Sequence, residues 1–206
     1  GELIVGCFVT LAPFFLPRLL KELQRSHPQL LVHLAEGALD QVQAALLAGE
    51  TEIGLVYDID LDRQLATEEL TRVRPHVLVA PNHHLAKHST VSLSALATEP
   101  MILLDLPHSR DYFRSLFFNA GVEPVIRHRT QSFELVRGLV GQGHGYSVLN
   151  LQPHSNRTYD GGRVIYIPIE DPTTDLAIAI ARPRGLQLTH RAEAFSAVCR
   201  RFFVDG

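Results

Sequence analysis

The sequence has few cysteines and no excess of basic residues. Its 206 residues contain two cysteines, Cys7 and Cys199, and no secretory signal precedes them. Two such thiols are expected to stay reduced in a cytosolic protein, as small buried apolar side chains rather than as a disulfide. The formal net charge at pH 7 is -3, whereas domains that bind nucleic acid usually carry a clearly basic surface. We therefore expect that this chain does not bind DNA by itself.

Long apolar runs are also missing. No stretch approaches the length needed to span a bilayer, and the N-terminus lacks the charged and apolar regions of a signal peptide. We predict no membrane partner and a cytoplasmic location. The chain starts without methionine, directly at an apolar strand, which is typical of a fragment of a longer protein. Its hydrophobic content of 46% is enough for a sizeable buried core.

What is present begins with a strand that leads into a helix. Residues 3–8 form an apolar run typical of a parallel strand buried on both faces. The following helix is expected to begin near Pro13, and Pro17 should distort its first turn unless the helix starts later. The loop between them lies at the carboxyl end of the strand, where ligands bind in open α/β sheets. Thr10 places a hydroxyl there, beside helix N–H groups that attract anions. Thr10 either contacts a ligand or merely caps the helix, and spacing alone favours the cap.

The strand-loop-helix pattern recurs along the chain. Further strands are predicted at 30–36, 53–56, 75–80, 101–104, 124–130, 146–149, 163–169 and 176–181, and further helices at 39–46, 112–117, 135–140 and 189–204. Ser109 and Ser132 stand where helix N-caps belong, so each brings a hydroxyl to a helix N-terminus. Repeated βα units indicate parallel sheets with right-handed crossovers.

These units form two sets. We predict an α/β fold of two Rossmann-like lobes joined by two crossover strands, with residues 1–80 and 170–206 in lobe I and residues 81–169 in lobe II. Helix N-termini of the two lobes are expected to face each other across a cleft. A small organic anion held by Thr10 from one lobe and Ser109 or Ser132 from the other would favour closure.

Two groups of residues suggest metal binding at first sight. Asp58, Asp60 and Asp62 alternate like a calcium loop, but the central glycine and closing glutamate of an EF-hand are missing, so we interpret them as a solvated turn. His83, His84 and His88 include an i, i+4 pair, yet prolyl and polar neighbours favour an exposed loop. No cysteine or carboxylate is expected nearby to complete a metal shell. The sequence therefore predicts no metal site and no cofactor.

Several segments together resemble a known family. Val5–Leu20, His27-Pro28, Glu36-Gly37, Leu47–Gly49, Ile53–Leu55 and Leu135–Gly145, with its spaced glycines, occur in the order and spacing of the effector-binding domain of LysR-type transcriptional regulators. The resemblance covers essentially the whole chain. It implies the type 2 periplasmic-binding-protein fold, preceded in the full-length protein by a winged helix-turn-helix domain and a linker helix.

The resemblance also implies a set of effector-binding residues. Thr10 matches the hydroxyl position after the first strand, and the loop from Leu106 to Ser109 faces the segments that line the second lobe. The complete set is Val9, Thr10, Leu106, His108, Ser109, Thr130, Ser132, Tyr146 and Ser147.

Three features of the chain depart from what some family members carry. Some members that respond to aromatic acids carry a second hydroxyl side chain after the second strand, at a position that falls near Leu39 in this chain. The absence of a hydroxyl at Leu39 puts a benzoate-like pose of the effector in doubt. Asn150 replaces a usual proline. The cysteine pair of redox-sensing members lies in the second lobe, whereas Cys7 and Cys199 lie outside it, so a peroxide switch is not supported.

The leading hypothesis is thus a ligand-sensing domain that biases a homodimeric or tetrameric regulator. DNA contact through the missing N-terminal domain and contact with RNA polymerase follow from the resemblance, and Phe14, Phe15 and Phe118 are candidate dimer contacts unless they belong to the core. A solute-binding protein of a transporter is the alternative, since it shares the fold, and a monomeric state would favour it. An enzyme is disfavoured because no nucleophile elbow, zinc-protease helix or P-loop is present.

Overall fold

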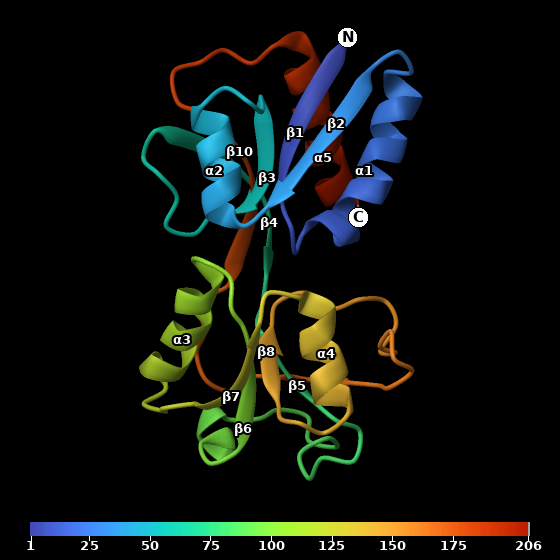
Figure 1. The fold of residues 1–206 in the computed structure, drawn as a ribbon. Helices are drawn as coiled ribbons and strands as arrows, with labels where there is room; N and C mark the ends of the chain where they lie inside the picture. The colour runs from blue at the N-terminus through green and yellow to red at the C-terminus, as the bar shows by residue number, and fades with distance from the viewer. Residues whose placement is uncertain (206) are drawn as a thin grey trace. The chain divides into compact units, whose positions relative to one another are not determined.

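The computed structural model describes residues 1–205, in which strands and helices alternate along most of the chain (Figure 1). These residues divide into two compact units. Unit 1 comprises residues 1–72 together with the C-terminal part from Ala177, and unit 2 comprises Val73–Leu176. No helix within residues 1–205 combines the length and apolar character needed to cross a bilayer.

Unit 1 is built on a five-stranded sheet with the order β2-β1-β3-β10-β4. Its strands are β1 (Glu2–Phe8), β2 (Leu31–Gly37), β3 (Ile53–Tyr57), β4 (Leu65–Val73) and β10 (Leu176–Pro183), and its helices are α1 (Ala12–Ser26), α2 (Leu39–Leu47) and α5 (His190–Asp205). β1 pairs in parallel with β2 and β3, whereas β10 runs antiparallel to β3. The predicted parallel βα units are therefore confirmed for this part of the chain.

β1 is buried on both faces, as its apolar run predicts. On one face, Gly6 pairs with Gly54 of β3, and a Cβ built on either glycine would lie 3.3–3.4 Å from Val42 of α2. The missing side chains let α2 pack directly on the strands. On the other face, α5 packs against β1, and the side chains of Cys7 and Cys199 are both fully buried. The sheet is thus covered by helices on both sides.

Pro17 behaves differently from the prediction. α1 starts at Ala12 and continues through Pro17 as one helix. Because the helix begins this early, Pro17 falls in the second turn, where its missing N–H removes one backbone bond without ending the helix. Pro13 occupies the first turn, where a missing N–H costs nothing.

Unit 2 contains two smaller sheets. β5 (His76–Val79) lies between β8 (Ser147–Leu149) and β9 (Ile165–Pro168), and β6 (Pro100–Leu104) pairs in parallel with β7 (Val125–Thr130). The helices are η1 (Leu93–Leu96), α3 (Ser109–Asn119) and α4 (Phe133–Gly141). The predicted lobe boundaries, after residue 80 and before residue 170, fall inside unit 2. They do so because β5 pairs with β8 and β9 rather than with the sheet of unit 1.

The glycines after α4 shape the entry into β8. Gly143 has a φ of 84°, which L side chains rarely adopt, and its N–H donates to the carbonyl of Val140. A Cβ on Gly145 would collide with the carbonyl oxygen of Pro100, which accepts the N–H of Tyr146. These positions let the chain turn sharply and lie close to β6.

A buried pair joins the two chain segments through which unit 2 begins and ends. The hydroxyl of Tyr112 in α3 donates to the carbonyl of Thr174 at 2.6 Å and accepts a bond from the Asn150 amide at 3.0 Å. The same Asn150 amide donates to the carbonyl of Val73 at 3.1 Å. Burial, more than any neighbouring charge, raises the pKa of Tyr112 to about 12. We call these four residues the clasp.

Removal of the clasp hydroxyl should destabilise the protein. Tyr112→Phe leaves the Thr174 carbonyl and part of the Asn150 amide unpaired, which is expected to lower the free energy of unfolding by roughly 1–3 kcal/mol. Urea denaturation followed by circular dichroism measures this loss. Tyr159→Phe is the matched control because Tyr159 is 91% exposed. Equal stabilities of the two variants would contradict the role given to the clasp.

Stability should also fall at alkaline pH. The pKa of Tyr112 is about 12 in the folded protein, against a usual value of 10, so the folded state binds this proton more tightly than the unfolded state does. The free energy of unfolding therefore decreases as pH rises through that interval. Burial also raises the pKa of Tyr146 and Tyr166, which adds to the slope. Urea midpoints across this range should fall less steeply for Tyr112→Phe than for the unmodified chain.

Candidate functional site

In unit 1, Thr10 lies in the loop between β1 and α1. Its side chain is 6% exposed, and α1 takes Leu11 as its N-cap residue without any side-chain capping bond. The interpretation of Thr10 as a helix cap is therefore wrong. Its hydroxyl forms no hydrogen bond within residues 1–205. The adjacent Val9 is partly exposed, and its N–H donates to the carbonyl of Gly37 at 2.8 Å, which brings the loops after β1 and β2 together.

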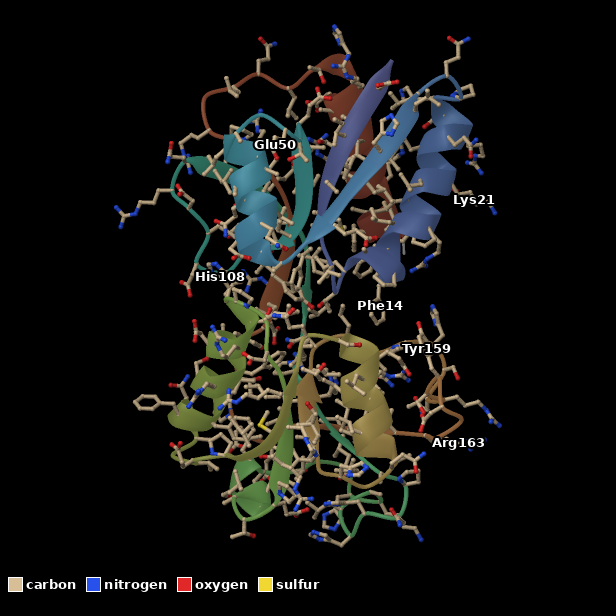
Figure 2. The ribbon with its side chains drawn as sticks, in the orientation of Figure 1. Phe14, Lys21, Glu50, His108, Tyr159 and Arg163 are labelled. Atoms are coloured by element: carbon tan, nitrogen blue, oxygen red, sulfur yellow. The ribbon has the colours of Figure 1, made fainter. Side chains whose placement is uncertain are left out.

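In unit 2, the loop after β6 leads into α3. Ser109 was expected to be the N-cap, but His108 takes that place with a φ of 67°, and Ser109 becomes the first helical residue. The Ser109 side chain is 2% exposed, and its hydroxyl has no partner within the described chain. Leu106 is buried beside it. Figure 2 shows His108 at the start of α3.

The loop after β7 lies next to the loop after β6. The N–H of Asp105 donates to the carbonyl of Thr130 at 2.8 Å, which joins them. Ser132 accepts a bond from the N–H of Leu135 at 3.1 Å, which confirms it as the N-cap of α4. The Thr130 hydroxyl in turn accepts the N–H of Ser132 at 3.2 Å. The structure thus brings the candidate residues of these two loops to one end of β6 and β7.

Tyr146 and Ser147 are placed differently. The Ser147 hydroxyl is fully buried and donates to the carbonyl of Ile102 in β6 at 2.6 Å. The Tyr146 side chain is 1% exposed, and its hydroxyl has no partner within residues 1–205. Burial and the charge of Glu99, which precedes β6, raise the pKa of Tyr146. These two side chains pack along β6, and the phenol lies toward the opposite end of that strand from Ser109.

Arg137 is a buried charge that the sequence reasoning missed. Its side chain is 3% exposed and forms an ion pair with Glu134 at 2.5 Å. It also donates to the Tyr166 hydroxyl and to the carbonyls of Ser155 and Arg157. Arg137 therefore ties the polar excursion before β9 to α4. Its i, i+3 spacing from Glu134 is the signal in the sequence that could have indicated this pairing.

The candidate metal residues also need a correction. The three aspartates at 58–62 form no group with metal-binding geometry among the described residues, whereas His83 and His84 lie beside the carboxylate of Glu99. Both imidazoles hydrogen-bond to it. The expectation that no carboxylate lies near these histidines is therefore wrong, because Glu99 is fifteen residues beyond His84 in the sequence.

Both cysteines are free thiols buried in unit 1. Burial raises the pKa of Cys199 to about 12, and burial together with the charge of Glu36 raises the pKa of Cys7 further. A thiol with such a pKa is almost entirely protonated at neutral pH and reacts poorly, because the thiolate is the nucleophile.

Comparisons with known proteins bear on what this arrangement is for. Two α/β units of this kind are typical of the type 2 periplasmic-binding-protein fold. Residues 1–204 match the LysR substrate binding domain family. The chain belongs to this family and is the effector-binding domain of a LysR-type transcriptional regulator.

Individual relatives agree with this assignment. The chain is 27% identical over 202 residues to the hydrogen peroxide-inducible genes activator of Pectobacterium carotovorum subsp. carotovorum, covering 97% of this chain and 66% of that protein. It thus spans just under two thirds of that relative's length. HinK, a LysR family transcriptional regulator from Pseudomonas aeruginosa, is 38% identical with a TM-score of 0.93, over 98% of this chain and 70% of HinK. The C-terminal domain of a probable LysR family regulator from Rhodococcus sp. RHA1 is 32% identical with a TM-score of 0.93, over 99% of this chain and 98% of that one.

Effector complexes with the same fold are more distant in sequence. The effector-binding domain of QuiR in complex with shikimate is 21% identical with a TM-score of 0.87, over 100% of this chain and 98% of that one. The BenM domain with benzoate is 23% identical with a TM-score of 0.83, over 99% of this chain and 92% of that one. At this identity the likeness shows the fold alone.

The buried thiols should be unreactive in the native protein. We expect the thiol reagent DTNB to modify neither Cys7 nor Cys199 at neutral pH within the time of a manual assay, and to modify both at once in guanidinium. Absorbance of the released thionitrobenzoate counts the thiols. Rapid reaction of either thiol in the folded protein would contradict the burial and the raised pKa values.

Proposed function

We propose that this domain binds a small organic anion through the loops that follow the strands of its two units. The observation that carries the proposal is the buried hydroxyl of Ser109, which has no hydrogen-bond partner within the described residues and lies at the N-terminus of α3. The Thr10 side chain, which is 6% exposed and does not cap α1, lies just before the start of that helix. A buried hydroxyl without a partner costs free energy, so a ligand that accepts its hydrogen bond recovers that cost. Free N–H groups in the first turn of a helix add attraction for negative charge.

Most of the remaining contacts would come from unit 2. At the ends of β6 and β7 the ligand would be surrounded by Leu106, His108, Thr130 and Ser132, and in unit 1 it would also contact Val9. The Thr130 hydroxyl accepts one internal bond and still has its proton to donate. Tyr146 and Ser147 would act indirectly, by holding β8 against β6.

The chemistry of known effectors supports an acidic ligand. The effector-binding domain of QuiR forms a complex with shikimate and that of BenM with benzoate, and both compounds carry a carboxylate. In this chain Leu39 begins α2 and is fully buried, and the preceding N-cap residue is Ala38. Neither can donate a side-chain hydrogen bond. In unit 1 a ligand would therefore be held by Thr10 alone. Its pose would differ from that of a ligand that also needs a hydroxyl at the start of α2.

In the full-length protein, we propose that effector binding alters DNA binding by a separate N-terminal winged helix-turn-helix domain. A homodimer or tetramer in the cytoplasm, acting on transcription by RNA polymerase, fits the LysR assignment better than an exported solute-binding protein. Phe118 of α3 is 84% exposed and is the strongest candidate for a subunit contact. Phe15 instead packs against Phe202 and Phe203 within unit 1, with ring centroids 6.4 and 5.0 Å away. We propose no catalytic role, in line with relatives that are transcriptional regulators.

A thermal-shift screen of small carboxylates and amino acids tests the proposal. A ligand present at about a hundred times its dissociation constant stabilises the folded state by roughly 2.7 kcal/mol, which should raise the melting temperature by roughly 5–10 °C. Thr10→Val should abolish this shift and leave the melting temperature without ligand nearly unchanged, because the hydroxyl has no internal partner to lose.

Thr90→Val is the control, since Thr90 is exposed and lies outside the candidate loops. A full shift in Thr10→Val would remove Thr10 from the site. A screen in which cationic or neutral compounds raise the melting temperature, and acids do not, would overturn the proposed ligand class.

A further inference from the structure

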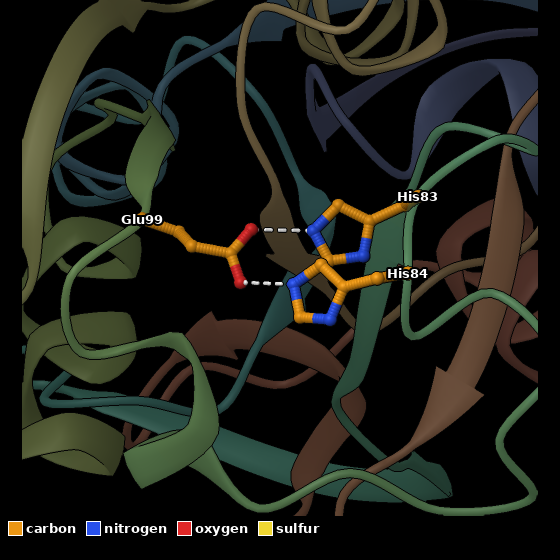
Figure 3. Close-up of side chains that lie close together, drawn as sticks. All are labelled: His83, His84 and Glu99. Atoms are coloured by element: carbon orange, nitrogen blue, oxygen red, sulfur yellow. Dashed lines mark hydrogen bonds and ion pairs between the residues drawn. The ribbon is translucent and has the colours of Figure 1, made fainter.

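The turn after β5 brings two adjacent histidines to one carboxylate (Figure 3). Neighbouring side chains on an extended chain point in opposite directions. Here the chain turns instead, and the rings of His83 and His84 stack with centroids 4.4 Å apart and planes 25° apart. Both rings contact the carboxylate of Glu99, which lies immediately before β6.

Each carboxylate oxygen contacts one imidazole. His83 Nε2 lies 2.5 Å from Glu99 Oε1, and His84 Nε2 lies 2.9 Å from Oε2. The side chains of His83 and Glu99 are 16% and 23% exposed, whereas that of His84 is 67% exposed. The three potential ligand atoms lie within 4.8 Å of one another, and no other group of this kind occurs in the part of the chain that the structure describes.

We propose that His83, His84 and Glu99 bind a divalent transition-metal ion of the zinc class. Two imidazole nitrogens and one carboxylate oxygen are a common ligand set for zinc, and a fourth position is left for water. Small movements of these side chains would suffice to bring them to metal-binding distance, because their ligand atoms already converge. The ring of His84, at the surface, is free to adjust. The site belongs to unit 2 and does not depend on the proposed effector.

The charge of the cluster favours a cation. Burial by itself would raise the pKa of Glu99, but hydrogen bonds from His83 and His84 outweigh it, so the pKa lies below its usual value. The carboxylate is therefore ionised at neutral pH. A bound dication would take the place of the two imidazole N–H groups beside the carboxylate and would neutralise its negative charge.

Metal binding at His83 would break one backbone hydrogen bond, and this gives the proposal a specific consequence. The N–H of Leu85 donates to His83 Nδ1 at 3.0 Å, so the neutral ring carries its proton on Nε2 and donates it to Glu99. A metal bound at Nε2 displaces that proton, and the neutral ring then carries a proton on Nδ1 instead. The Leu85 N–H loses its acceptor as a result. Metal binding should thus be sensed at Leu85, whose amide does not touch the ion.

Titration of the untagged, metal-free 206-residue domain with Co²⁺ and Zn²⁺ tests the site. One ion per chain is expected. Bound Co²⁺ should give the visible absorption bands typical of a low coordination number, and added Zn²⁺ should remove them by displacing the Co²⁺. His84→Gln and Glu99→Gln should each weaken binding by roughly 100-fold or more. His88→Gln is the matched control, because His88 is exposed in the same turn and outside the cluster, and should bind as the unmodified chain does.

The Leu85 amide supplies the second readout. Its signal in a ¹H–¹⁵N spectrum should move and its hydrogen exchange should accelerate when Zn²⁺ binds, and neither change should occur in His84→Gln. His84→Gln replaces an exposed ring, so its fold is expected to persist, which a melting curve checks. Absence of saturable binding, binding that survives both substitutions, or binding that leaves Leu85 unaffected would each overturn the proposal.

Discussion

The clasp is the interaction on which the arrangement of unit 2 most depends. One phenol and one amide satisfy carbonyls from the first and the last segment of the unit, so two segments far apart in sequence are held together through Tyr112 of α3. Tyr112 lies one helical turn after Ser109. The loop proposed to contact a ligand and the two segments that lead to unit 1 are therefore attached to the same rigid helix.

Much of the fold could be predicted because its signals are local. β1, α2 and α4 follow from apolar periodicity, helix-stopping glycines and a serine N-cap, all of which can be identified within a few residues. The lobe boundaries could not be located in the same way. Whether β5 belongs to one unit or the other depends on its pairing with β8 and β9, and those partners lie far along the chain.

The placement of the candidate residues after strands was predictable, whereas their local geometry was less so. The position of Thr10 after β1 follows from a local apolar run, but no local pattern indicates that His108 adopts a φ of 67° and displaces Ser109 from the N-cap. Arg137 was hidden because a charged residue on the buried face of a helix becomes favourable only when distant groups pair with it. The approach of Glu99 to two histidines likewise depends on the path of the chain through η1, which periodicity does not define.

The spaced glycines at the end of α4, which form part of the resemblance to the LysR family, have a structural role in this chain. Gly143 is required by its backbone angle and Gly145 by the nearby carbonyl of Pro100, so both serve the packing of β8 against β6. These glycines thus belong to the scaffold of the fold. The proposed ligand contacts, such as Thr10, lie apart from them in the loops that follow strands. Exchanges at those strand ends would therefore alter the proposed ligand contacts while the packing of β8 against β6 stayed the same.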